Sequence, residues 1–300
     1  MFQTCTIDSD SSDSTLINNI KRRKTVLEES IKTSADFLRK TLPYKPTILV
    51  ICGSELGFLT KDLEDISEIS YSSIPKFPTT AGTNKGKLIL GRISKVPVLF
   101  MQERLHLYEG HPLWKCTLPI RILQSLEIKV MLISNTSRAV NKLYKKGDVM
   151  IIEDHIDLAR LLGNFSLRGP EENLFDFDYN PFNKIYDKKL IETGVNIGKE
   201  VLAKRRVHKG VYSFSAGPNQ ESGADINFLQ RFGSDVVGSS SVHEAIVAKS
   251  CGMTVFGFSL IGSICGVDCV RDEDHHEEAS GGADLTEFFR RIINEINVTA

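Results

Sequence analysis

The sequence carries almost no net charge and lacks an apolar run long enough to cross a membrane. Its 37 basic and 38 acidic residues leave a formal charge of −1, so neither nucleic acid nor an anionic membrane surface is a favoured partner. Residues 1–14 are rich in serine and aspartate and lack the basic-then-apolar pattern of a secretion signal. We therefore expect a cytoplasmic protein that contacts no membrane.

Cysteine is also scarce. The six cysteines are Cys5, Cys52, Cys116, Cys251, Cys265 and Cys269. Most of them lie inside apolar segments, which favours reduced, packed thiols over a disulfide framework. Cys265 and Cys269 have a spacing that metal ligands can adopt, but no second pair accompanies them. We expect no metal site.

The 300 residues have the composition of a globular protein, with 41% hydrophobic and 25% charged residues. We expect residues 1–14 to be a disordered tail and residues 15–300 to form a single domain. Apolar strand-like runs alternate with helical patterns, which predicts an α/β fold with a mostly parallel, covered sheet. The predicted strands are 47–52, 88–90, 96–101, 130–134, 149–152, 210–215, 235–238 and 253–260. The predicted helices are 15–42, 114–126, 184–204, 225–232, 240–250 and 285–296, with a polar turn at 135–138.

One stretch of mixed polarity follows the predicted strand 96–101. Arg104, His106 and Tyr108 alternate with two leucines, so an extended chain would place these three side chains on one face. An arginine fork beside a titratable imidazole is suited to bind phosphate or carboxylate. The same triplet is compatible with a solvated strand end, so the remaining polar residues decide between the two interpretations.

Polar residues recur where predicted strands end. Those at or just beyond such an end are Ser54, Arg104, Thr136, Glu221, Ser240 and Ser263. Ligands of open α/β sheets bind outside the carboxyl ends of the strands. The pattern therefore predicts one pocket that collects these groups, with Gly53 and Ser54 opening a helical stretch that can present backbone N–H groups to an anion.

Several motifs in a fixed order carry a resemblance to a known family. They are Ile51–Ser54, Ile74–Pro78, Met101–Gly110, Arg168–Pro170, Ala216–Pro218 with Glu221, Val237–Gly238 with Ser240, and His276–Glu278. Over about residues 45–296 the chain resembles the trimeric purine nucleoside phosphorylases. The resemblance implies a mixed, mostly parallel central sheet covered by helices on both faces. It also implies phosphorolysis of purine ribonucleosides to free base and ribose 1-phosphate, with phosphate as co-substrate and no metal or organic cofactor.

The resemblance further implies roles for individual residues. The phosphate site would comprise Ser54, Arg104, His106, the backbone of Thr136, and Ser240. Catalytic roles would fall to Glu221, His106, Ser263 and His276. The nucleoside would be bound by Tyr108, Gln220, Glu221, Ser239, Ser263, His276, Asn84 and, from a neighbouring subunit of a homotrimer, Phe175. Three of these residues have simpler interpretations: Glu221 as a solvated helix start, His276 as part of an acidic surface run, and Phe175 as core.

The departures from the family gather in the base site. Ser263 replaces an Asn whose side chain stabilises the departing purine at N7 and O6; Gln220 replaces an aromatic residue, Ser239 a Met and Asn84 a His. Glu55 and Arg138 stand where the family has glycine. We expect Arg138 either to pair with Glu55 or to enter the base pocket and partly fill it.

Three functions follow from this mixture of retained and altered residues. The first is phosphorolysis of purine ribonucleosides. The second is a phosphorylase with a shifted base preference, which Gln220, Ser239 and Ser263 favour. The third is a catalytically weak family member that binds ligand or assembles with a partner subunit. Ser263 and Arg138 favour the second or the third function. The first or the second is favoured by the retained residues, which are Arg104, His106, Tyr108, Glu221, Ser240 and His276.

Overall fold

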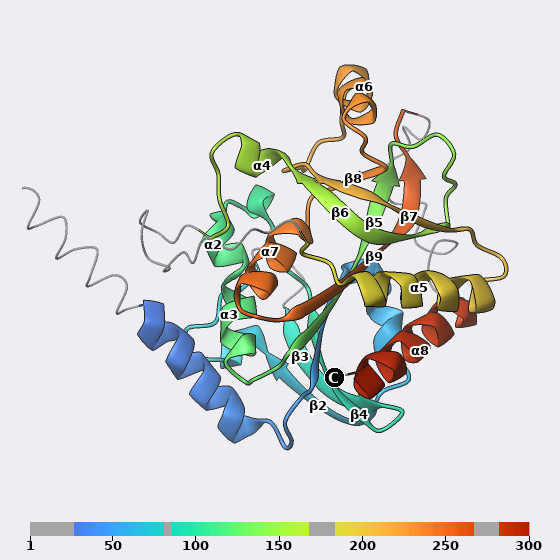
Figure 1. Ribbon diagram of the computed structural model, residues 1–300. Helices are drawn as coiled ribbons and strands as arrows, with labels where there is room; N and C mark the ends of the chain where they lie inside the picture. The colour runs from blue at the N-terminus through green and yellow to red at the C-terminus, as the bar shows by residue number, and fades with distance from the viewer. Residues whose placement is uncertain (1–26, 81–85, 168–183, 267–281, 300) are drawn as a thin grey trace, which may run out of the picture.

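The computed structural model describes residues 27–80, 86–167, 184–266 and 282–299, without the side chains at 54, 55, 298 and 299 (Figure 1). In these ranges the strands form one nine-stranded sheet in the order β2-β3-β4-β1-β5-β8-β7-β6-β9. The strands are β1 Ile48–Cys52, β2 Glu64–Ser70, β3 Lys87–Ile93, β4 Val96–Gln102, β5 Val130–Ala139, β6 Val149–Asp157, β7 Val207–Phe214, β8 Val236–Gly238 and β9 Thr254–Ile264.

The sheet is mixed, and it closes on itself at one end. Five of the strand pairings are parallel and four are antiparallel. Because β5 pairs with β9 as well as with β1 and β8, the strands β5-β8-β7-β6-β9 form a closed ring. The predicted mixed, mostly parallel α/β sheet is confirmed.

Helices cover both faces of this sheet. Apart from a helix over residues 27–41, they are α2 Leu113–Cys116, α3 Leu118–Gln124, α4 Leu158–Leu161, α5 Lys188–Val201, α6 Gly223–Arg231, α7 Val242–Ser250 and α8 Ala283–Thr299. The 3₁₀ helices are η1 Ser54–Thr60, η2 Tyr71–Ser73 and η3 Leu107–Glu109. In Figure 1, α5 packs along α8 on one face, and α3 packs with α7 on the other.

The buried runs of the sequence form the centre of the sheet. Every residue of β1 is buried, as expected for a continuous apolar strand between two neighbours. On one face, Phe288 and Phe289 of α8 pack against Phe258 and Phe100 of the sheet, with ring centroids 5.5 and 5.8 Å apart. Aromatic burial of this kind provides much of the packing energy of such a core.

Two predicted elements differ from the structure. The polar turn expected at residues 135–138 is strand, because β5 continues to Ala139 through its ladder with β9. The single helix expected at 114–126 is two short helices, α2 and α3, which meet at Thr117 with a proline following. The predicted tail, residues 1–14, lies outside the described residues, and the single-domain boundary stays a prediction.

No helix within the described ranges is both long and apolar enough to span a bilayer.

One buried histidine predicts a pH dependence of folding. Burial lowers the pKa of His155 from 6.5 to about 4, and its Nδ1 lies 3.2 Å from the Tyr186 hydroxyl. Between these two pH values the unfolded chain binds a proton that the folded chain excludes. The free energy of unfolding should therefore fall as the pH drops through this window, by up to about 3 kcal/mol.

The variant His155→Gln removes this titration while retaining an amide that can bond to Tyr186. Urea unfolding at pH 7 and at pH 4.5 should show a smaller loss of stability in the variant than in the unchanged protein. Equal losses in both proteins would mean that His155 does not contribute to the acid sensitivity of the fold.

Candidate active site

A cavity of about 400 Å³ opens where several strands end. Its lining includes Gly53, Glu103, Arg104, His106, Tyr108, Asn135, Thr136, Ser137, Arg138, Ser215, Gly217, Pro218, Asn219, Gln220, Glu221, Val237, Gly238, Ser239, Ser240, Gly262 and Ser263. On one edge, β5 pairs with β1 up to Ile133 and with β8 only from Arg138. Among the described strands, residues 134–137 therefore have ladder partners on the β9 side alone, and this gap forms the cavity floor.

Arg104 is the buried cation of the cavity. It follows β4 and is only 4% exposed. Its Nη1 donates to the Ser241 hydroxyl at 3.0 Å and its Nη2 to the Ser134 carbonyl at 2.8 Å. Its Nε lies 3.9 Å from a carboxylate oxygen of Glu244 and has no hydrogen-bond partner among the described residues. These contacts fix the guanidinium in the cavity wall, where a buried positive charge favours an anionic ligand.

Ser241 connects the arginine to the floor of the cavity. Its hydroxyl also accepts a hydrogen bond from Asn135 Nδ2 at 2.8 Å, and the Asn135 oxygen accepts one from Ser259 at 2.7 Å. Ser241 has a φ of 73°, in the left-handed region that serine seldom adopts. Strain of this kind persists where surrounding contacts enforce it and often marks a functional turn; the preceding residue, Ser240, lines the cavity.

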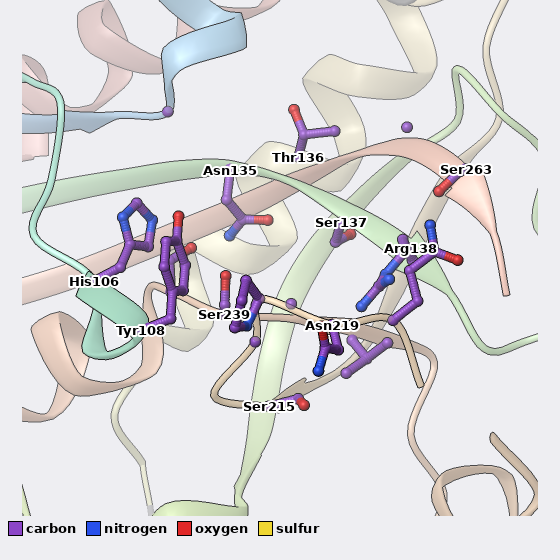
Figure 2. A pocket seen from close by; sticks show the side chains of 18 of the residues that line it. His106, Tyr108, Asn135, Thr136, Ser137, Arg138, Ser215, Asn219, Ser239 and Ser263 are labelled. Carbon is purple, nitrogen blue, oxygen red and sulfur yellow. The ribbon is translucent and has the colours of Figure 1, made fainter. Parts of the chain in front are cut away.

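His106 and Tyr108 form the wall beside this charge (Figure 2). Their rings stack with centroids 4.6 Å apart, and His106 Nδ1 lies 3.1 Å from Glu109. Burial, followed by the nearby Arg104 charge, lowers the pKa of His106 below its usual value, although Glu109 acts in the opposite direction. The chain is not extended throughout, since Glu103 has a φ of 66° and η3 begins at Leu107, yet all three predicted polar side chains line one cavity.

An ion pair occupies the opposite side of the cavity. Arg138 Nη2 lies 2.5 Å from Glu221 Oε2, and the Glu221 side chain is only 6% exposed. Figure 2 shows Arg138 and Ser263 on one side of the cavity and His106 and Tyr108 on the other. Ser222 begins α6 with a capping box to Asp225, which fixes the backbone directly after Glu221.

The loop before Glu221 lies close to Tyr108. Gly217 has a φ of 64°, and a Cβ there would lie 3.2 Å from Tyr108 and 3.4 Å from Ser239. Glycine is thus favoured by the backbone conformation, and a side chain here would press against Tyr108.

Most of the predicted site residues meet in this cavity. Those that line it are Arg104, His106, Tyr108, Thr136, Gln220, Glu221, Ser239, Ser240 and Ser263. Asn84, Phe175 and His276, together with the side chain of Ser54, lie outside the described residues. Reasoning from sequence missed Asn135, Ser241 and Glu244. The first two carried a signal, since they stand beside the predicted Thr136 and Ser240.

The hypothesis that Arg138 enters the pocket agrees with its position in the lining. Among the described side chains, Arg138 forms its ion pair with Glu221. Glu55 has no described side chain, so the alternative pairing of Arg138 with Glu55 is untested.

Comparison with known proteins identifies the family. A family model described as Phosphorylase superfamily matches residues 47–296. The chain is 35% identical to a purine nucleoside phosphorylase of Anopheles gambiae, over 91% of this chain and 79% of that one. It is 37% identical to purine nucleoside phosphorylase 1 of Bacillus subtilis, over 79% and 86% of the two chains.

Solved structures agree with the sequence comparison. This chain superposes with a TM-score of 0.83 on the crystal structure of isoform 2 of purine nucleoside phosphorylase from Schistosoma mansoni, in complex with cytosine and ribose-1-phosphate. That structure shares 35% identity with this chain and covers 89% of this chain and 96% of its own. The chain therefore belongs to the phosphorylase superfamily and, within it, to the purine nucleoside phosphorylases.

Proposed function

We propose that the chain catalyses the phosphorolysis of purine ribonucleosides, in which phosphate displaces the base and yields ribose 1-phosphate. The observation that carries this proposal is a single cavity with a buried Arg104 beside His106 at one end and a carboxylate, Glu221, at the other. An anion and a base can therefore bind on opposite sides of a ribose.

The chemistry favours a fixed anion beside the sugar. The transition state of such a displacement resembles an oxocarbenium cation, so a positioned phosphate acts both as nucleophile and as electrostatic stabiliser. Arg104 would hold the phosphate, with Ser240 and the backbone at Thr136. Tyr108, stacked on His106, would contact the ribose.

His106 would take part through its second nitrogen. A neutral imidazole agrees with the lowered pKa of His106, and the bond to Glu109 is best made by a protonated Nδ1. Nε2 then carries a lone pair that can accept the proton of hydrogen phosphate, which makes the attacking oxygen more nucleophilic.

The proposal includes no metal and no organic cofactor. Purified protein treated with EDTA should convert inosine and phosphate to hypoxanthine and ribose 1-phosphate in equal amounts, as measured by chromatography and ³¹P NMR. Without phosphate it should release no base. Base release that is independent of phosphate, or absent in its presence, would contradict phosphorolysis.

A shifted base preference is the second candidate function. It is favoured by the ion pair between Arg138 and Glu221 in the base half of the cavity. Schistosoma enzymes of the family have been crystallised with hypoxanthine, with adenosine and, for isoform 2 of Schistosoma mansoni, with cytosine and ribose-1-phosphate. A panel of inosine, guanosine, adenosine, cytidine and uridine would identify the preferred base. No turnover of any, with phosphate still bound in calorimetry, would instead support a binding subunit.

We also propose a cytoplasmic homotrimer. Support comes from Leu161 and Leu162 of α4 and its C-terminal end, which are 67% and 88% exposed, since exposed apolar residues often mark interfaces. The free thiols of the four described cysteines suit a reducing compartment. Light scattering should give a mass of about three times the chain mass of 33.5 kDa. The substitution Leu162→Asp should lower the mass of the assembly. A mass of one chain would contradict the trimer.

A further inference from the structure

The departing base poses a chemical problem that Arg138 can solve. This inference rests on the phosphorolysis proposed above. When the bond from C1′ to N9 breaks, the electron pair stays with the base, and a neutral nucleoside releases its base as an anion. In a 6-oxopurine this charge spreads to O6 and N7. A donor or a positive charge directed at these atoms lowers the barrier.

Arg138 is the cation at the base end of the described cavity lining. It stands opposite Ser263 in the parallel ladder between β5 and β9. Register partners on neighbouring strands project from the same face of a sheet, and both residues line the cavity. Because serine is short, the space in front of Ser263 is open to the longer guanidinium side chain.

Glu221 holds this cation and still has an acceptor to offer. The ion pair joins Arg138 Nη2 to Glu221 Oε2. Glu221 Oε1 is buried and has no hydrogen-bond partner among the described residues. A buried acceptor without a partner is unfavourable, so this oxygen is suited to a donor on a bound ligand. The base end thus offers a fixed double donor beside a free acceptor.

We propose that Arg138 stabilises the departing base by donating hydrogen bonds to O6 and N7 of a 6-oxopurine. Arginine reads the same pair of acceptors on guanine through a bidentate contact. Glu221 fixes the guanidinium, and its Oε1 accepts from the N1–H of the base. Adenine has an amino group in place of O6, so one donor of Arg138 would face a donor even though N7 remains an acceptor. Its N1 carries no hydrogen to donate to Glu221.

The reaction balances without another reactant. A phosphate oxygen forms a bond to C1′ while the bond from C1′ to N9 breaks and its electron pair passes to the purine. Arg138 neutralises the charge on O6 and N7 during this step. The proton of hydrogen phosphate ends on the released base by way of His106 and solvent.

The test compares inosine with 7-methylinosine at saturating phosphate. The methylated nucleoside carries a positive charge and releases a neutral base, so it needs no cation at N7. Arg138→Gln should lower kcat/KM for inosine about 100- to 1000-fold, the range for loss of a transition-state donor. The same variant should change kcat/KM for 7-methylinosine by less than about threefold.

Two further variants make the result decisive. Arg138→Lys keeps a charge beside Glu221 but lacks the planar fork. It should therefore lose activity toward inosine and not toward 7-methylinosine, and the loss should be smaller than in Arg138→Gln. This variant provides the test if Arg138→Gln folds poorly. Arg205→Gln is the matched control, because Arg205 also pairs with a carboxylate, Asp284, but does not line the cavity. It should leave both substrates unaffected.

The outcomes separate this inference from the function on which it rests. An equal loss of both activities in the Arg138 variants, or no loss, would overturn the role of Arg138 in leaving-group stabilisation. Failure of the unchanged protein to use either nucleoside would instead overturn the proposed phosphorolysis.

Discussion

Arg104→Met should raise the KM for phosphate and lower kcat/KM for phosphate by at least about 1000-fold, more than the loss of a single neutral donor produces. Arg104 is the buried cation beside the predicted phosphate position, and its two Nη atoms are fixed by Ser241 and the Ser134 carbonyl. Met fills a similar volume but has neither charge nor donor. Initial rates of inosine phosphorolysis over a range of phosphate concentrations give the measurement.

The same change also removes a partner from Glu244, which is itself buried. An unpaired buried charge costs roughly 3–5 kcal/mol, so Arg104→Met should lower the thermal unfolding temperature as well. The double variant Arg104→Met with Glu244→Gln separates the two effects, since it should regain stability without regaining phosphate use. A phosphate KM within threefold of normal in either variant would contradict the anion site.

Glu221→Ala should lower kcat/KM for inosine about 100- to 1000-fold while leaving the KM for phosphate nearly unchanged. The side chain belongs to the end of the cavity opposite Arg104, and its loss removes both the partner of Arg138 and the buried acceptor at Oε1. Glu221→Gln keeps a carbonyl of similar reach, so about a tenfold loss is expected there. Steady-state kinetics with inosine varied at saturating phosphate, and then the reverse, provide the comparison.

Glu287→Ala is the matched control for the glutamate. Glu287 forms an exposed ion pair with Arg290 on α8, and such pairs contribute little to stability. This variant should behave as the unchanged protein. A raised KM for phosphate in Glu221→Ala, with an unchanged KM for inosine, would show that the phosphate and base ends of the cavity have been assigned in the wrong order.

Much of the fold could be predicted from periodicity alone. Continuous apolar runs gave β1 and β4, because strands between two neighbours are buried on both faces. The error at residues 135–138 has a clear cause. These polar residues look like a turn, but β9 pairs with them over the whole length of β5, and a partner so distant in sequence leaves no local signal.

The phosphate half of the cavity could also be predicted, whereas the base half could only be outlined. Arg104, His106 and Tyr108 stand close together in sequence, so alternation and motif both pointed to them. The contact between Arg138 and Glu221 joins positions that are far apart in the chain. From the sequence, Arg138 could either pair with Glu55 or enter the base pocket, because its long flexible side chain can reach both places.

A crystal structure of the protein with inorganic phosphate and hypoxanthine would test the two-ended site most directly. Phosphate should contact Arg104 and Ser240, and hypoxanthine should lie with O6 and N7 toward Arg138 and N1 toward Glu221. Phosphate bound away from Arg104, or a base that contacts neither Arg138 nor Glu221, would contradict the assignment.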